Sequence, residues 1–156
     1  MNKQAVLDQF LAALTADLAT LTRAANGAFA AATDPDSKAE NKYDTRTLEA
    51  SYIARGQAKR VTELQEAVQA FGALSGVELV AGATAALGAL VTVDGPEGAD
   101  RYLIGPAAGG TEILHEGFPI MVITPASALG QKLVGKRAGE SISIRPGAEA
   151  QIIGVK

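Results

Sequence analysis

The sequence of 156 residues predicts an α+β protein whose helices and strands occupy separate parts of the chain. Leucine and alanine recur every three or four residues as far as Phe71, which is the spacing of amphipathic helices. From residue 73 onward, short apolar stretches alternate with glycine- and proline-rich turns, which is typical of antiparallel strands. We therefore expect an antiparallel helical hairpin over 1–74, a connector over 75–88, and a small antiparallel β-sheet domain with one short helix over 89–156.

The first helix is expected over residues 3–32, where no proline interrupts the pattern. Its apolar positions are spaced like the a and d positions of a coiled coil, which form the seam against a partner helix. They are Leu7, Leu11, Leu14, Leu18, Leu21, Ala25, Ala28 and either Phe29 or Ala32.

The second helix is expected to end near Phe71, with Gly72 as the residue just beyond its end. Two helices of similar length with a short polar connection favour an antiparallel hairpin that projects from the rest of the molecule. The alternative is that both helices pack onto the globular half. The expected seam of the second helix is Leu48, Tyr52, Ala54, Ala58, Val61, Leu64, Val68 and Phe71.

Six apolar stretches in the remaining chain predict strands. They lie at 89–93, 101–105, 111–115, 119–124, 141–144 and 150–155. Residues 127–136 predict a short helix, with Ser127 as its N-cap and Gly135 as its stop. The glycines of 105–110 are expected to serve a hairpin turn.

Composition and charge exclude several classes of function. The formal net charge of −3 gives no basic field for nucleic acid phosphates, so no direct sequence-specific nucleic acid contact is expected. The absence of cysteine excludes disulfides and thiolate metal sites. The amino-terminal stretch carries Asp8 and Asp17, so we expect neither a signal peptide nor a membrane span, and a cytoplasmic location. His115, the one histidine, lacks companion ligands and is interpreted as a partly exposed strand-end residue without a catalytic role.

The segment DPDSKAENKYDT at residues 34–45 concentrates acidic side chains between the two expected helices. Ser37 and Glu40 have the spacing of a capping box, in which both side chains satisfy backbone N–H groups at a helix start. The competing interpretation is a pair of carboxylates that share a Mg²⁺ ion. Two carboxylates bind Mg²⁺ weakly, so a partner would have to supply the other ligands.

Two stretches of the carboxyl-terminal half resemble the GreA/GreB family of transcript-cleavage factors. VITPASALGQKLVGKRAGESISI followed by AQIIGV resembles the family's Ser-Pro, short helix, Leu-x-Gly-Lys and closing hairpin. LGALVTVDGPEGADRYLIGPAAGG resembles the strand pair that opens the same FKBP-like domain, and PDSKAENKY falls over the family's acidic tip. The resemblance covers roughly residues 33–155 and is weakest in the helices.

The resemblance implies RNA polymerase as the partner. In that family the coiled coil enters the secondary channel, two tip acids help to hold a catalytic Mg²⁺, and the globular domain docks on the channel rim. It assigns the Mg²⁺ ligands to Asp36 and Glu40, jointly with the polymerase, and no stably bound cofactor. Partner contacts at the tip are assigned to Asp34, Asp36, Glu40, Tyr43 and Asp44, and domain docking is assigned to Thr124, Pro125 and Ser127.

The chain departs from the family at two motifs. Ala39 stands where the second tip acid belongs, with Glu40 displaced by one position, which is a rotation of about 100° on a helix. Ala128 stands where the proline of Ser-Pro belongs. We therefore expect a polymerase-binding regulator that is not an enzyme, is a monomer or weak homodimer, and has no membrane partner.

Three alternatives remain open from the sequence. The first is true transcript cleavage with Asp36 and Glu40. The second is an FKBP-like interaction module unrelated to transcription, or a prolyl isomerase, although Tyr102 and Phe118 are the only aromatic residues available to line its pocket. The third is a hairpin that dimerises through its leucine seam.

Overall fold

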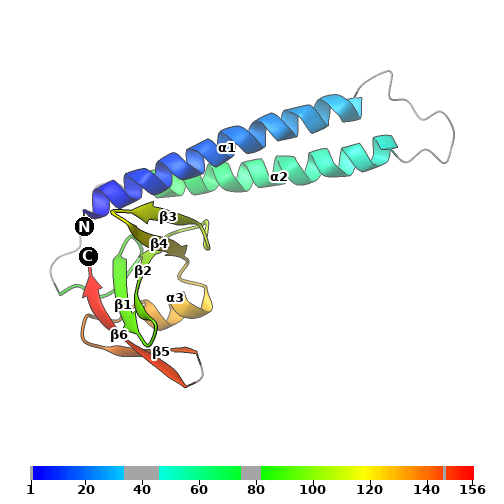
Figure 1. Cartoon of the computed structure of the whole chain (residues 1–156). Coiled ribbons are helices and arrows are strands. Elements are labelled where there is room, and N and C mark those ends of the chain that lie inside the picture. Colours follow the sequence, from blue (N-terminus) through cyan, green and yellow to red (C-terminus); the bar gives the residue numbers. More distant parts are fainter. Residues whose placement is uncertain (1, 34–45, 75–81, 146) are drawn as a thin grey trace. The chain divides into compact units, whose positions relative to one another are not determined.

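The computed structural model describes residues 2–33, 46–74, 82–145 and 147–156 (Figure 1). Two helices, α1 (Lys3–Thr33) and α2 (Arg46–Gly72), precede six strands and one short helix, so the predicted α+β class is confirmed. The chain divides into two compact units. The helical unit comprises Ala12–Val68, and the sheet unit comprises Gln69–Lys156 together with Met1–Leu11.

Within the helical unit, α1 and α2 run side by side in opposite directions (Figure 1). Leu14 is fully buried, and Leu18, Leu21, Ala25 and Ala28 are half-buried, so the predicted seam of α1 is confirmed at these positions. Phe29 is 63% exposed and does not belong to the seam.

The predicted seam of α2 is wrong at its amino-terminal end. Leu48 is 56% exposed, Tyr52 is 65% exposed, and Ala58 is exposed as well. As far as Val68, the half-buried positions of α2 follow an unbroken alternation of four- and three-residue steps, and this alternation places Leu48 and Tyr52 outside the seam. These positions are Ala50, Ala54, Gln57, Val61, Leu64 and Val68.

The end of α2 also differs from the prediction. Gly72 is the last residue of the helix and does not adopt the left-handed conformation of a residue beyond it. The helix instead closes through short-range bonds, with the N–H of Leu74 donating to the carbonyl of Phe71 at 3.0 Å.

Helix α1 is unusually apolar for an exposed helix. Within Lys3–Ala31, an 18-residue window has a mean hydropathy of 1.2, so this stretch is long and apolar enough to cross a membrane, by length and composition only. Core helices of soluble proteins meet the same criterion, and α1 contributes its leucine seam to the pairing with α2. The expectation that the protein has no membrane partner stays a prediction.

The sheet unit contains all six predicted strands. They are β1 (Leu90–Gly95), β2 (Gly98–Ile104), β3 (Glu112–His115), β4 (Phe118–Ile123), β5 (Ser141–Arg145) and β6 (Ala148–Val155). The strand order is β3-β4-β2-β1-β6-β5. All neighbouring pairs are antiparallel except β2 and β4, which are parallel.

This strand order contradicts the hairpin turn expected over residues 105–110. Because β4 lies between β2 and β3, the chain leaving β2 crosses to the edge of the sheet before it returns as β4. The crossing loop is held to β4 by backbone bonds from Gly105 N–H to the carbonyl of Ile123, 2.9 Å, and from Gly110 N–H to the carbonyl of Val122, 2.8 Å.

Both faces of the sheet are partly covered. On one face, Val91, Ile104, Ile123 and Ile152 belong to a core that includes Leu133 of α3 (Ala128–Leu133). On the other face, Phe71 approaches Gly105 so closely that a Cβ on that glycine would lie 2.7 Å from the Phe71 ring. The rings of Phe71 and Phe10 pack together with their centroids 6.3 Å apart.

Candidate functional site

The acidic tip predicted from the sequence lies outside the described residues. This applies to Asp34, Asp36, Glu40, Tyr43 and Asp44, as well as to the capping-box and metal-site interpretations of the segment. Among the residues that the structure describes, no group of three or more His, Asp or Glu side chains could hold a metal ion.

The ends of α1 and α2 that adjoin residues 34–45 carry four large apolar side chains in solvent. We call Phe29, Leu48, Tyr52 and Ile53 the distal apolar side chains. Their exposed fractions are 63%, 56%, 65% and 55%. Single exposed apolar residues are ordinary on protein surfaces, but four at one end of a helix pair make this end a candidate contact surface.

The seam between the two helices is formed by small side chains in this region, which explains why the distal apolar side chains are exposed. Ala25 and Ala28 of α1 and Ala50 and Ala54 of α2 occupy the half-buried positions near this end. Alanines let two helices approach closely but fill little space, so larger side chains one or two positions away remain outside the contact.

A shallow groove crosses both helices at this end. It has a volume of about 290 Å³ and is lined by Phe29 and Thr33 of α1 and by Ser51, Ala54, Arg55 and Ala58 of α2. Its small floor residues and the Phe29 ring can accept an apolar side chain, and the Arg55 guanidinium at its wall can pair with an acidic one.

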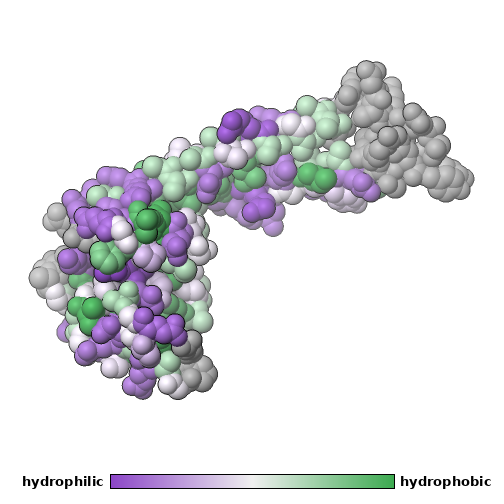
Figure 2. Space-filling model, in the orientation of Figure 1, coloured by the Kyte–Doolittle hydropathy of each residue, from purple (hydrophilic) through white to green (hydrophobic). Residues whose placement is uncertain are grey.

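Charge is distributed unevenly over the helix pair. Helix α1 has no charged residue after Arg23, whereas α2 carries Arg55, Lys59 and Arg60 in succession. In Figure 2 the α1 side of the pair is mostly pale green, and purple residues gather along α2. Lys59 and Glu63 lie 3.8 Å apart, but both are exposed, so this pair contributes little stability.

The predicted docking residues Thr124, Pro125 and Ser127 lie between β4 and α3. Ser127 caps α3, since its Oγ accepts a hydrogen bond from the N–H of Gly130 at 3.0 Å. The Ser127 hydroxyl donates to the carbonyl oxygen of Thr124 at 2.7 Å, and the Ser127 N–H donates to the same oxygen at 3.0 Å. Pro125 is exposed, whereas Thr124 and Ser127 are half-buried.

These bonds give Ser127 a structural role, because its hydroxyl both accepts and donates inside the loop. The predicted N-cap is therefore confirmed, and Gly135 follows the helix with a positive φ of 84°, as its predicted stop. Ala128 is the first residue of α3, the position at which proline is favoured in helices. Pro125 remains the one predicted docking residue whose side chain is exposed.

His115 ends β3, as predicted, and its side chain is only 12% exposed. Its Nδ1 lies 2.9 Å from Oε1 of Gln9, and the amide nitrogen of Gln9 donates to the carbonyl of Leu114 at 2.8 Å. Because Oε1 of Gln9 can only accept, Nδ1 carries the proton. His115 thus fixes the start of α1 against the edge strand β3, within the sheet unit.

Two residues of the helix pair lie outside the sites predicted from the sequence. Ile53 is one of them, although an apolar residue on an otherwise polar face of α2 is a usable signal. Gln57 occupies a seam position, and its Oε1 is buried without a hydrogen-bond partner. Because glutamine is common on exposed helix faces, its place in the seam could only be found once the phase of the helix was known.

No protein-family model and no curated protein matches the chain. Among solved structures, it is similar to GreA factor homolog 1 (Gfh1) of Thermus thermophilus, with 16% identity over 94% of each chain and a TM-score of 0.38. It is similar to Thermus aquaticus Gfh1, with 19% identity over 91% of this chain and 90% of that one and a TM-score of 0.37. A third structure, of the transcription factor Gfh1, gives 20% identity, 97% and 92% coverage, and a TM-score of 0.37.

These solved structures are of GreA homologues, and so fall in the family that the sequence resembles. At these identities and TM-scores, the likeness carries no conclusion about what this chain binds or does.

Proposed function

We propose that this protein is a cytoplasmic regulator of transcription that binds RNA polymerase at its secondary channel without efficiently cleaving RNA. The observation that carries the proposal is the group of distal apolar side chains, which flank the acidic segment on both helices. In a freely soluble hairpin these side chains have no role, whereas a hairpin that inserts into a partner would cover them.

The family resemblance names the partner. The motifs at 122–155 and the acidic segment at 34–45 resemble GreA/GreB factors, in which the hairpin enters the polymerase and the globular domain docks outside. We infer the same division of roles here, with the distal apolar side chains and the groove beside Phe29 inside the polymerase and Pro125 at the docking loop.

The absence of efficient cleavage follows from the tip sequence. Only Asp36 matches a tip acid of the family, and Ala39 stands at the second position. Removing one carboxylate from a shared Mg²⁺ site removes both a ligand and a negative charge, which weakens recruitment of the ion.

The first test is binding to bacterial core RNA polymerase, measured by native mass spectrometry or a pull-down at micromolar protein. We expect a complex with the wild-type chain. The double variant Phe29→Ser/Tyr52→Ser should bind at least about tenfold more weakly, because buried aromatic side chains carry much of an interface's binding energy. Ile153→Ser, which replaces a side chain of similar exposure (52%) in the sheet unit, is the matched control and should bind normally.

Absence of any complex at micromolar protein would contradict the proposal. Cleavage is assayed separately, as Mg²⁺-dependent shortening of RNA in backtracked elongation complexes, and none is expected. Efficient shortening that Asp36→Ala abolishes would show that the protein is a true cleavage factor, while leaving the polymerase partner intact.

A further inference from the structure

Helix α3 covers only part of one face of the sheet. The part of that face formed by residues of β2, β3 and β4 is open to solvent. Met121 lies opposite Tyr102 of β2 and opposite Glu112 of β3, and Leu114 lies opposite Pro119. Because alternate residues of a strand share a face, these side chains lie on the same face as the core residues Ile104 and Ile123.

This part of the face, which we call the open strip, consists of Tyr102, Leu114, Pro119 and Met121. Leu114 is 65% exposed and Met121 is 36% exposed. Pro119 is exposed, and Tyr102 is half-buried at the margin of the core. The open strip is therefore an apolar sheet surface in solvent.

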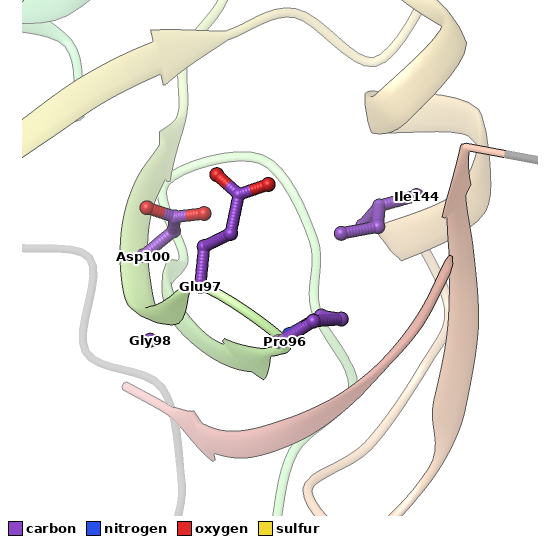
Figure 3. A pocket seen from close by; sticks show the side chains of 6 residues that line it. Pro96, Glu97, Gly98, Asp100 and Ile144 are labelled. Atoms are coloured by element: carbon purple, nitrogen blue, oxygen red, sulfur yellow. The ribbon is translucent and has the colours of Figure 1, made fainter. Parts of the chain in front are cut away.

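An acidic hollow lies beside the open strip, at the turn between β1 and β2. It has a volume of about 170 Å³ and is lined by Gly95, Pro96, Glu97, Gly98, Asp100 and Ile144. Figure 3 shows the carboxylates of Glu97 and Asp100 near one another, with Ile144 across from them. Asp100 is joined to the open strip, since it accepts a hydrogen bond from the Tyr102 hydroxyl at 3.3 Å.

The Tyr102 hydroxyl remains a donor over the whole physiological range. Burial, the negative charge of Asp100 and the hydrogen bond to Asp100 together raise the pKa of Tyr102 to about 12, with burial as the largest cause. Asp100 is thereby held at the boundary between the hollow and the open strip.

The charged residues of the segment 90–123 are almost all acidic. Residues 90–123 contain five acidic residues and no lysine, and their one arginine is Arg101. Arg101 alternates with Tyr102 along β2 and lies on the opposite face, with its guanidinium carbon 3.9 Å from the centre of the Phe118 ring. The five acidic residues are Asp94, Glu97, Asp100, Glu112 and Glu116.

We propose that the open strip and the acidic hollow bind an extended basic segment of a partner protein. A lysine or arginine side chain of that segment would enter the hollow beside Glu97 and Asp100. Apolar residues next to it would cover Leu114 and Met121, because alternate side chains of an extended chain project to the same side about 7 Å apart.

The charge selects this occupant over two others. A nucleic acid would bring phosphates to a negative surface, which opposes binding. A second copy of the chain would bring the same carboxylates face to face, and like charges across an interface are unfavourable. The proposal does not rest on the polymerase, because a basic segment of any partner would fit.

The test is a titration of the ¹⁵N-labelled full chain followed by NMR, with the acetylated, amidated peptide Lys-Leu-Lys-Leu-Lys as the probe. We expect saturable shifts of the amides of Asp100, Tyr102, Leu114 and Met121, with a dissociation constant of about 1 mM or tighter. The peptide Glu-Leu-Glu-Leu-Glu, which has the same apolar residues, should give no saturable shifts. Raising NaCl from about 50 to about 500 mM should weaken binding of the basic peptide, because salt screens exposed charges.

Two variants separate the contributions of charge and apolar surface. Glu97→Gln/Asp100→Asn and Leu114→Ser should each weaken binding of the basic peptide by about fivefold or more. The control Glu63→Gln/Glu66→Gln removes the same charge from α2 and should leave the affinity unchanged. A dispersed spectrum for each variant confirms that it is folded.

Several results would overturn the proposal. They are the lack of saturable shifts, shifts confined to other residues, equal binding of the acidic peptide, and loss of affinity in the α2 control. Concentration-dependent shifts of the same amides without peptide would identify a second copy as the occupant, which would also contradict it.

Discussion

Gly130 illustrates how a single residue holds the loop that the family resemblance assigns to docking. A Cβ at this position would overlap the carbonyl oxygen of Thr124 and would lie 2.9 Å from Oγ of Ser127. That carbonyl already accepts two hydrogen bonds from Ser127, so moving it away from the Cβ would disturb both bonds.

We therefore predict that Gly130→Ala destabilises the protein by about 2 kcal/mol or more, because the methyl group overlaps backbone atoms. The measurement is urea unfolding followed by circular dichroism. Gly56→Ala is the matched control, since a Cβ at Gly56 in α2 meets nothing within 4 Å. It should stabilise the chain by about 0.5–1 kcal/mol, because alanine is the better helix former. A neutral Gly130→Ala would mean that the loop can move away from α3.

Among the elements, the strands were predictable and their order was not. Each strand shows short apolar runs bounded by glycine, and this local pattern suffices to locate it. The parallel pairing of β2 with β4 depends on contacts between residues far apart in sequence, whereas proximity in sequence favours a hairpin from β2 to β3. The glycines of the 105–110 loop therefore suggested a turn that the structure replaces with a crossing.

The helix seams show a different limit of sequence analysis. In α1 the leucines mark the phase, and the seam was found. In α2 alanine occurs on several faces of the helix, so the alanines do not show which face forms the seam. The predicted seam therefore combined Leu48, Tyr52 and Ala58, which are exposed, with Ala54, which is half-buried. Large side chains ordinarily define the seam, but near residues 34–45 the large side chains are exposed and the alanines are inside. The exposed end is the part of the hairpin to which we assign function.

Gln57 gives a prediction for the seam itself. Its Oε1 is buried without a hydrogen-bond partner, a state that opposes folding. Gln57→Leu should stabilise the helical unit by about 1 kcal/mol, because it removes this group and fills the alanine-rich seam. Gln65→Leu, at an exposed position of the same helix, should change the stability by less than about 0.5 kcal/mol. Thermal and urea unfolding measure both variants, and a destabilised Gln57→Leu would indicate that the amide has a specific partner.

The two units of the molecule differ in how much core each possesses. Among the buried apolar residues that the structure describes, only Leu14 and Ala67 belong to the helical unit. The remainder lie in the sheet unit, where Val91, Leu103, Ile104, Ile120 and Ile152 are fully buried. The change from helical to strand-like patterns at residue 73 predicts a helical and a β-rich part, and the boundaries expected at residues 74 and 88 stay predictions. The acidic tip, on which the proposed function also depends, lies outside the described residues.

This difference predicts the pattern of hydrogen exchange across the native protein. Amides of α1 beyond Arg23 and of α2 before Ala58 should exchange through local openings of low free energy, because little apolar surface is exposed when these turns open. Amides of Val91, Ile104 and Ile152 should exchange only with unfolding of the sheet unit. Native-state exchange followed by NMR at increasing denaturant measures both sets, and only the second should depend strongly on denaturant concentration. A single free energy of opening for both sets would instead mean that the chain unfolds as one cooperative body.

The same exchange measurement also tests the proposed function. Binding of core polymerase should selectively protect the amides of α1 beyond Arg23 and of α2 before Ala58, because the proposed function places the distal apolar side chains inside the partner.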